Sequence, residues 1–73
     1  MKKAEFVALL KIQGLRLLMC EVNRAVHTHE EKMYAADVVT SRWNVVTEGE
    51  PAKTPAAAVQ KTIARHYKQY ANH

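Results

Sequence analysis

The chain contains one cysteine, Cys20, among 73 residues, and this combination limits the folds that are open to it. A lone cysteine cannot form an internal disulfide, so a covalent staple for a small core is excluded. A chain of this length forms one domain at most and buries only roughly 60% of its unfolded surface. We therefore expect a single domain, residues 1–73, that is further stabilised by association with a second copy.

The composition is that of a globular chain, because 48% of the residues are hydrophobic and only two Gly and two Pro are present. The N-terminal segment has two lysines before an apolar stretch, as a secretion leader would have. Lys11 and Arg16 interrupt that stretch, and no run of about 18 uninterrupted apolar residues exists. We therefore expect a cytoplasmic protein without a membrane span.

Apolar residues recur at helical spacing through the first third of the chain. Six of them follow at spacings of 4, 3, 4, 3 and 4: Ala8, Ile12, Leu15, Met19, Val22 and Val26. This pattern predicts a long helix over about residues 3–26, in which Gly14 costs about 1 kcal/mol relative to Ala and introduces a kink or break. A second apolar row lies on a different side of this helix: Phe6, Leu10 and Leu17. Both rows cannot face one small core, so either the rest of the chain covers this helix on both sides or one row faces a second copy. Of these two, we expect the second row to form a homodimer interface.

The middle of the chain carries a helix-start pattern followed by β-branched residues. Thr28 with Glu31 three residues later is typical of a capping box, which predicts a second helix over about residues 29–43. The β-branched content of residues 38–46 also fits a short strand, and the pattern leaves both interpretations open. Residues 44–54 contain a glycine and a proline and are expected to form a loop.

The C-terminal segment has the clearest start signal in the chain. Thr54 is a good N-cap and Pro55 suits the first helical position, so a third helix is predicted over about residues 55–71. The expected fold is therefore all-α, a small domain of three helices with a long apolar first helix. Seven residues are expected to be buried: Leu15, Met19, Val22, Trp43, Val59, Ile63 and Tyr67.

Charge is distributed in three blocks along the chain. Residues 1–26 carry a net charge of +3, residues 27–50 carry −3, and residues 51–73 carry +4 with no acidic residue. Two basic ends around an acidic middle indicate either an anionic partner or a self-complementary assembly.

The basic residues of the third helix gather on one side of it. Lys61, Arg65, Lys68 and Asn72 follow at i, i+4, i+7 and i+11, opposite the apolar residues, and we call them the basic row. Lysine and arginine neutralise phosphates, while arginine, glutamine and asparagine also read base edges. The predicted nucleic-acid-binding residues are Lys53, Gln60, Lys61, Arg65, Lys68, Gln69 and Asn72. A merely solvated face and an acidic protein partner are the alternative interpretations.

Other sites have little support in the sequence. The "HTHEE" segment has His27 and His29 two residues apart, which point in different directions on a helix, so no metal site is expected. A Gly-rich phosphate loop and a serine elbow are both missing from the sequence. We therefore expect no catalytic residue, no cofactor and no small-molecule substrate.

The patterns together favour a small cytoplasmic DNA-binding or transcription-regulating protein that acts by binding, through a basic C-terminal helix. The alternative function is a helical adaptor or inhibitor that binds another protein through the apolar first helix.

Overall fold

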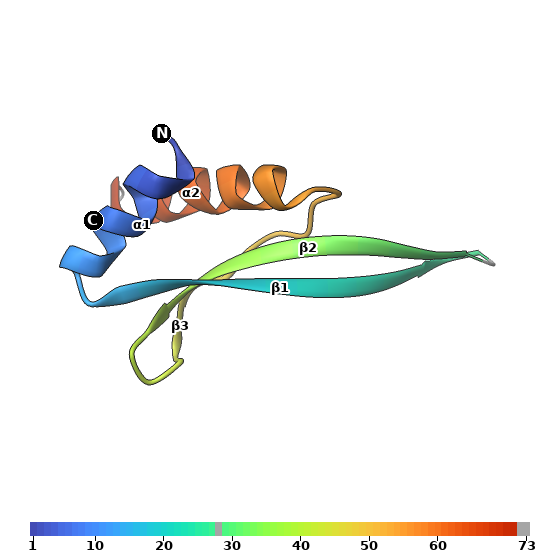
Figure 1. Cartoon of the computed structure of the whole chain (residues 1–73), viewed down its shortest axis with the longest axis horizontal. Helices are drawn as coiled ribbons and strands as arrows, with labels where there is room; N and C mark the ends of the chain where they lie inside the picture. The colour runs from blue at the N-terminus through green and yellow to red at the C-terminus, as the bar shows by residue number, and fades with distance from the viewer. Residues whose placement is uncertain (28, 72–73) are drawn as a thin grey trace.

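The computed structural model describes residues 1–27 and 29–71 and shows a mixed α/β fold. Five elements follow one another along the chain: α1 (Lys3–Ile12), β1 (Leu15–Val26), β2 (His29–Thr40), β3 (Val45–Thr47) and α2 (Pro55–Ala71). The strands form an antiparallel sheet in the order β1-β2-β3, and both helices lie over the same face of this sheet (Figure 1). The prediction of an all-α, three-helix domain is therefore wrong.

The helix predicted over residues 3–26 ends after its first ten residues because of Gly14. The backbone N–H of Gly14 donates to the carbonyl oxygen of Lys11 at 3.1 Å, and its φ is +73°. A positive φ is open to glycine at little cost, so the chain turns out of the helix here and enters β1 at Leu15. Gly14 is thus the end of α1 rather than a kink within a longer helix.

β1 and β2 form a long regular hairpin in place of the predicted helical segments. Their pairing runs without a shift from Leu15 opposite Thr40 to Val26 opposite His29. The far end of this hairpin projects beyond the helices (Figure 1). The helix predicted over residues 29–43 is therefore wrong, and Thr28, its expected cap, lies outside the described residues. The strand interpretation of residues 38–46 is closer to the structure.

A tight turn joins β2 to β3 and carries Trp43 outward. The Thr40 hydroxyl accepts the backbone N–H groups of Arg42 and Asn44, each at 3.2 Å. Trp43 has a φ of +66° and is 59% exposed, so the prediction that it is buried is wrong. The guanidinium carbon of Arg16 lies 5.5 Å from the Trp43 ring centroid, which is a cation–π contact.

The core lies between the two helices and the sheet face that they cover. Six buried side chains form it: Phe6, Leu10, Ala36, Val38, Val59 and Ile63. The predicted burial of Val59 and Ile63 is confirmed, and Leu15 and Met19 are half-buried at the margin of this core. Val22 and Tyr67 are 38% and 41% exposed, so their predicted burial is wrong.

The segment between β3 and α2 runs back along β2 and closes the core on that side. Tyr34 and Ala52 exchange two backbone hydrogen bonds of 2.7 Å each, and the N–H of Gly49 donates to Asp37 Oδ1 at 2.6 Å. A Cβ at position 49 would overlap the backbone of Ala36. The close approach of this segment to β2 therefore requires glycine at that position.

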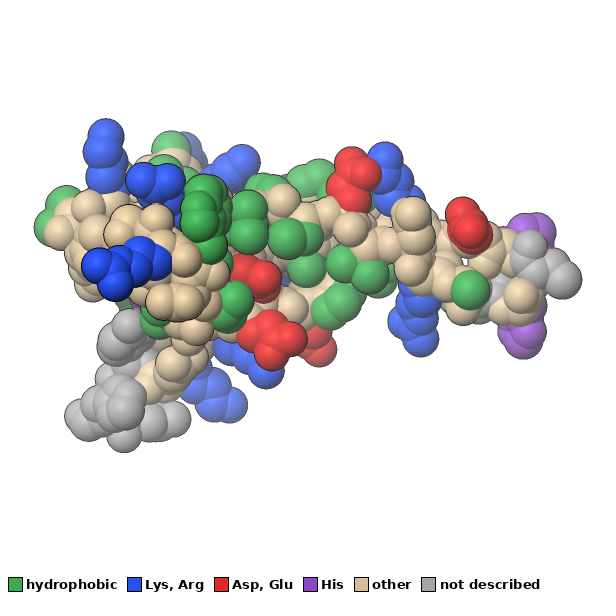
Figure 2. Space-filling view, turned by 90° about the horizontal axis from the view of Figure 1, so that it is seen from below, with side chains coloured by type: hydrophobic (Ala, Val, Ile, Leu, Met, Phe, Trp, Pro, Cys, Tyr) green, Lys and Arg blue, Asp and Glu red, His purple; other side chains and the backbone are tan. Residues whose placement is uncertain are grey.

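The opposite face of the sheet is covered by neither helix (Figure 1). Figure 2 views this face and shows hydrophobic side chains along its middle with acidic side chains among them. Leu18 and Cys20 are half-buried residues of β1 that alternate away from the helix-facing residues Leu17 and Met19. Over the described residues, neither helix combines the length and the apolar character needed to cross a membrane.

Candidate nucleic-acid interface

α2 begins where the sequence predicts, because Thr54 caps it. The Thr54 hydroxyl accepts the backbone N–H of Ala57 at 3.1 Å, and Pro55 occupies the first helical position. The residues that α2 turns toward the sheet are small or medium in size: Ala58, Val59, Thr62, Ile63 and His66. The other residues of α2 up to Gln69 are exposed.

The exposed side of α2 carries the basic row with small residues beside it. Lys61, Arg65 and Lys68 are exposed, as are Ala57 and Ala64, which lie on the same side of the helix. Lys61 Nζ donates to the carbonyl oxygen of Pro51 at 3.3 Å, and Arg65 donates to that of Glu48 at 3.2 Å. Exposed hydrogen bonds of this kind exchange readily with water, so both cations stay available to a partner.

The remaining predicted binding residues do not share this side of α2. Gln60 donates to the carbonyl oxygen of Met1 at 3.1 Å, whereas Gln69 points toward β3 and donates to that of Val46 at 3.4 Å. Lys53 precedes the helix and lies 3.8 Å from Glu31 of β2. Asn72, the last member of the basic row, lies outside the described residues.

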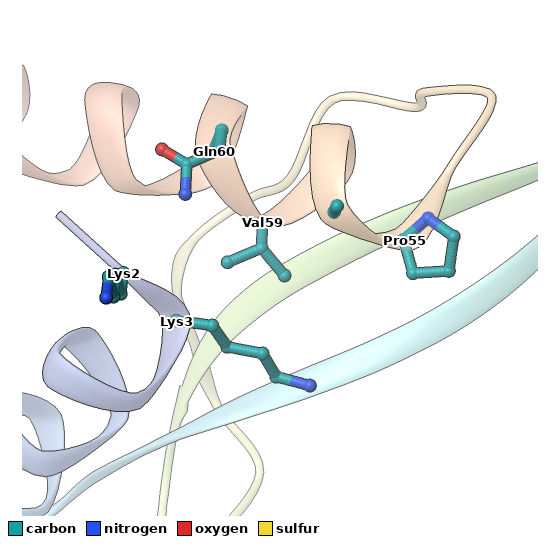
Figure 3. A pocket seen from close by; sticks show the side chains of 6 residues that line it. Lys2, Lys3, Pro55, Val59 and Gln60 are labelled. Carbon is teal, nitrogen blue, oxygen red and sulfur yellow. The ribbon is translucent and has the colours of Figure 1, made fainter.

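Two lysines from the other end of the chain lie beside α2. Lys2 and Lys3 line a cavity of about 450 Å³ together with Pro55, Val59 and Gln60 of α2 (Figure 3). Sequence reasoning did not assign these lysines to the candidate site, because they are more than fifty residues away from α2. Lys2 and Lys3 lie beside α2 because both helices cover the same face of the sheet.

The charges separate by layer. We define the helix layer as residues 1–13 and 53–71, and the sheet layer as residues 14–52. The helix layer holds seven of the eleven basic residues and one acidic residue, a net charge of +6, whereas the sheet layer has four basic and six acidic residues, a net charge of −2. The seven cations are all exposed: Lys2, Lys3, Lys11, Lys53, Lys61, Arg65 and Lys68.

Ion pairs neutralise few of these cations. Over residues 1–27 and 29–71, Lys53 is the only cation of the helix layer within ion-pair distance of a carboxylate. The single acidic residue of the layer is Glu5, in the first turn of α1. Within the described residues, most cations of the helix layer therefore have no carboxylate within ion-pair distance, although the segment that contains Glu48 and Glu50 runs beside Lys61 and Arg65.

His66 belongs to the core of the domain rather than to this surface. Its Nδ1 lies 2.7 Å from the hydroxyl oxygen of Thr47, and its ring lies edge-on to Phe6 with 5.6 Å between centroids. Burial lowers the pKa of His66 below its ordinary value of 6.5, because the charged form loses hydration there. In the part of the chain that the structure describes, no three potential metal ligands come together.

The expected homodimer residues divide between two environments. Phe6 and Leu10 are 0% and 1% exposed within a single chain, so they fill its own core and offer no surface to a second copy. The dimer contact was predicted because two apolar rows were expected on one long helix. In the structure Phe6 and Leu10 lie on α1 but Leu17 lies on β1, so these residues do not form one row on a helix. Leu17 is half-buried on that strand, at the margin of the core.

Comparison of this chain with protein-family models, with curated proteins and with solved structures finds no match. The interpretation of the surface therefore rests on its residues and their geometry.

Proposed function

We propose that this domain binds duplex DNA through the exposed side of its helix layer, and that it acts by binding rather than by catalysis. The observation that carries the proposal is the separation of charge between the layers, +6 against −2. A surface with uncompensated lysine and arginine attracts the phosphate backbone and releases its counterions.

The shape of α2 fits this role. The helix has 17 residues and is about 25 Å long, and the major groove of B-DNA, about 12 Å wide, admits an α-helix. Ala57 and Ala64 lie beside the cations on the exposed side, and their short side chains permit a close approach of the helix backbone. Lys61, Arg65 and Lys68 would then contact phosphates, with Lys2 and Lys3 extending the contact beside the N-terminal half of α2.

The test is fluorescence anisotropy of a labelled mixed-sequence duplex at two salt concentrations. If about four phosphates are neutralised, the affinity should fall roughly 100-fold between about 50 mM and about 200 mM salt. Replacing Lys61, Arg65 and Lys68 with Ala should abolish most of the binding.

The matched control removes three cations from the sheet layer instead, by replacing Arg24, Lys32 and Arg42 with Ala. Both triple variants lose the same net charge, so a non-specific charge effect would weaken both equally. The proposal predicts that the control keeps most of its affinity. Equal losses, or no binding by the unmodified protein at low salt, would contradict it.

A protein partner is the second candidate function, and the outer side of α1 favours it. Leu9 and Ile12 are 42% and 83% exposed, and Leu9 lines a cavity with Tyr67 of α2. A contiguous exposed apolar patch marks a protein interaction site, and tyrosine is among the residues that carry the most binding energy in interfaces. An adaptor that uses this surface would ignore duplex DNA, and replacing Leu9 and Ile12 with Ser would abolish its association with the partner.

A further inference from the structure

The two edges of the sheet are protected to different degrees. β3, at one edge, has three residues, and its pairing with β2 contains a register shift between Val38 and Val39. Short edge strands and bulges keep an edge from pairing with another chain. β1, at the other edge, has twelve residues in unbroken register with β2 and contains neither Pro nor Lys, and its charged residues Arg16, Glu21 and Arg24 lie outside the apolar run of residues 17–20. β1 therefore lacks these protections along an edge that extends over its whole length.

The side chains of β1 have the pattern of an interior strand. Residues 17–20 read Leu-Leu-Met-Cys, so apolar side chains point to both faces of the sheet, and all four residues are half-buried. Such continuous apolar runs are typical of strands that are buried on both faces. A single chain thus leaves apolar surface of β1 uncovered on both sides of the sheet.

A groove of about 330 Å³ follows β1 on the side of the helices. Its lining combines apolar residues of β1 and α1 with three cations: Leu15, Leu17, Met19, Val7, Lys3, Lys11 and Arg16. An occupant of this groove needs apolar side chains for its floor and a negative charge for the lysines.

We propose that a second copy of this chain pairs antiparallel with β1, so that the two sheets join into one continuous sheet. Backbone hydrogen bonds along the edge and apolar side chains on both faces would hold the pair together. The two-fold axis stands perpendicular to the sheet, which places both helix layers on the same side. The dimer thus presents two basic surfaces side by side.

Charge excludes two alignments of the two strands. An axis at Cys20 would set Arg16 opposite Arg24 of the second copy, and an axis at Glu21 would set that carboxylate opposite itself. Like charges directly opposite each other destabilise an antiparallel pair. Axes at Leu18 and at Met19 both avoid these pairs, and we place the axis at Met19, which aligns Leu18 with the second copy's Cys20 and keeps the apolar runs together.

The alignment with its axis at Met19 also places a negatively charged side chain of the second copy at the groove along β1. With the axis at Met19, the second copy's Glu21 lies opposite Leu17 on the side of the helices. Lys3 and Lys11 line the groove at that position, so the second copy supplies the negative charge that they lack. In its own chain, Glu21 Oε1 lies 3.3 Å from Lys32 Nζ, but both side chains are more than half exposed, and such a pair contributes little.

Disulfide trapping tests this alignment directly. Residues opposite each other in antiparallel strands have Cα atoms about 4.5–5.5 Å apart, which is within disulfide range. In a Cys20→Ser background, a single cysteine at position 19 should form a covalent dimer under mild oxidation, because it meets its own copy on the axis. The control is a single cysteine at position 42, which is exposed in the β2–β3 turn, is more accessible than position 19 and should nevertheless remain monomeric. Equal cross-linking at the two positions, or none at position 19, would overturn the proposed alignment.

A charge-reversal cycle tests the pairing without altering the core, because the three residues involved are exposed. Lys3→Glu with Lys11→Glu should raise the dissociation constant of the dimer about tenfold in sedimentation analysis. Adding Glu21→Lys to that variant should restore dimerisation, whereas Glu21→Lys alone should weaken it. A protein that is monomeric at every concentration, or a dimer indifferent to all three changes, would refute the proposal.

Discussion

α1 and α2 cover the same sheet face, but different kinds of side chain hold them there. α1 inserts Phe6 and Leu10, the two largest fully buried side chains of the domain. α2 instead packs closely against β2 through Ala58 and Thr62, both 0% exposed, and the Thr62 hydroxyl lies 2.5 Å from the carbonyl oxygen of Ala36. α1 thus supplies apolar volume, whereas α2 adds close approach and buried hydrogen bonds to the apolar contacts of Val59 and Ile63. Because the contacts that hold α2 lie on its sheet-facing side, Lys61, Arg65 and Lys68 on its outer side are not needed for packing.

The largest effect is expected for Phe6→Ala, which removes most of the apolar volume that α1 contributes. Phe6 is 0% exposed and contacts the rings of His66 and Tyr67, so its loss opens a cavity between the helices. We expect the free energy of unfolding to fall by about 3–5 kcal/mol, measured by urea denaturation. Val7→Ala on the same helix, where the side chain is 40% exposed, serves as the control. Equal losses at the two positions would show that α1 is not held by its buried residues.

An intermediate effect is expected for Thr62→Val, which keeps the shape of the side chain and removes the hydroxyl. The carbonyl oxygen of Ala36 then loses a buried donor, which costs about 1–3 kcal/mol. Thr62→Ser retains the hydroxyl and removes only a methyl group, so it separates hydrogen bonding from packing. Should the serine variant be the less stable of the two, α2 would be held by apolar packing in the same way as α1.

The start of α2 was predictable because its signals are local. Thr54 and Pro55 act through hydrogen bonding and backbone geometry within one turn, and no tertiary contact overrides them. The basic row was predictable for the same reason, since the spacing of Lys61, Arg65 and Lys68 places them on one side of any α-helix.

The long β1–β2 hairpin was not predictable because β1 and the first half of β2 are poor in β-forming residues. β1 contains Val22 and Val26 as its only β-branched residues, and leucine, methionine, arginine and glutamate favour a helix. The hairpin connection, His27 and Thr28, also lacks the Asn-Gly or Asp-Gly signal of a two-residue turn. Long-range pairing with β2 and cover from both helices outweigh these local preferences. Trp43 was misplaced for the same reason, because a turn replaces the predicted helix.

A smaller, pH-dependent effect is expected from His66 of α2. Burial lowers the pKa of His66 in the folded state, so between this value and the ordinary value of 6.5 the unfolded chain binds more protons than the folded one. The stabilising contribution of the neutral ring is therefore fully present above about pH 6.5 and is lost as the pH falls through the lowered value.

Urea denaturation at several pH values, from about 7.5 to about 5, measures this dependence. His66→Asn removes the titrating group and should flatten the decrease in stability toward low pH relative to the unmodified protein. The comparison between the two proteins cancels the contributions of the other titrating residues. Parallel pH profiles would mean that His66 is protonated in the fold without cost, in spite of its burial.

The smallest effect on stability is expected for Ala64→Leu on the outer side of α2. Ala64 is exposed, so the change should alter the free energy of unfolding by no more than about 0.5 kcal/mol. If DNA approaches this side closely, the longer side chain should nevertheless weaken duplex binding by about tenfold, or about 1.4 kcal/mol. Ala4→Leu makes the same exchange at an exposed position of α1 and should leave binding unchanged. Unchanged affinity in both variants would mean that the cations of α2 reach phosphate without insertion of the helix into a groove.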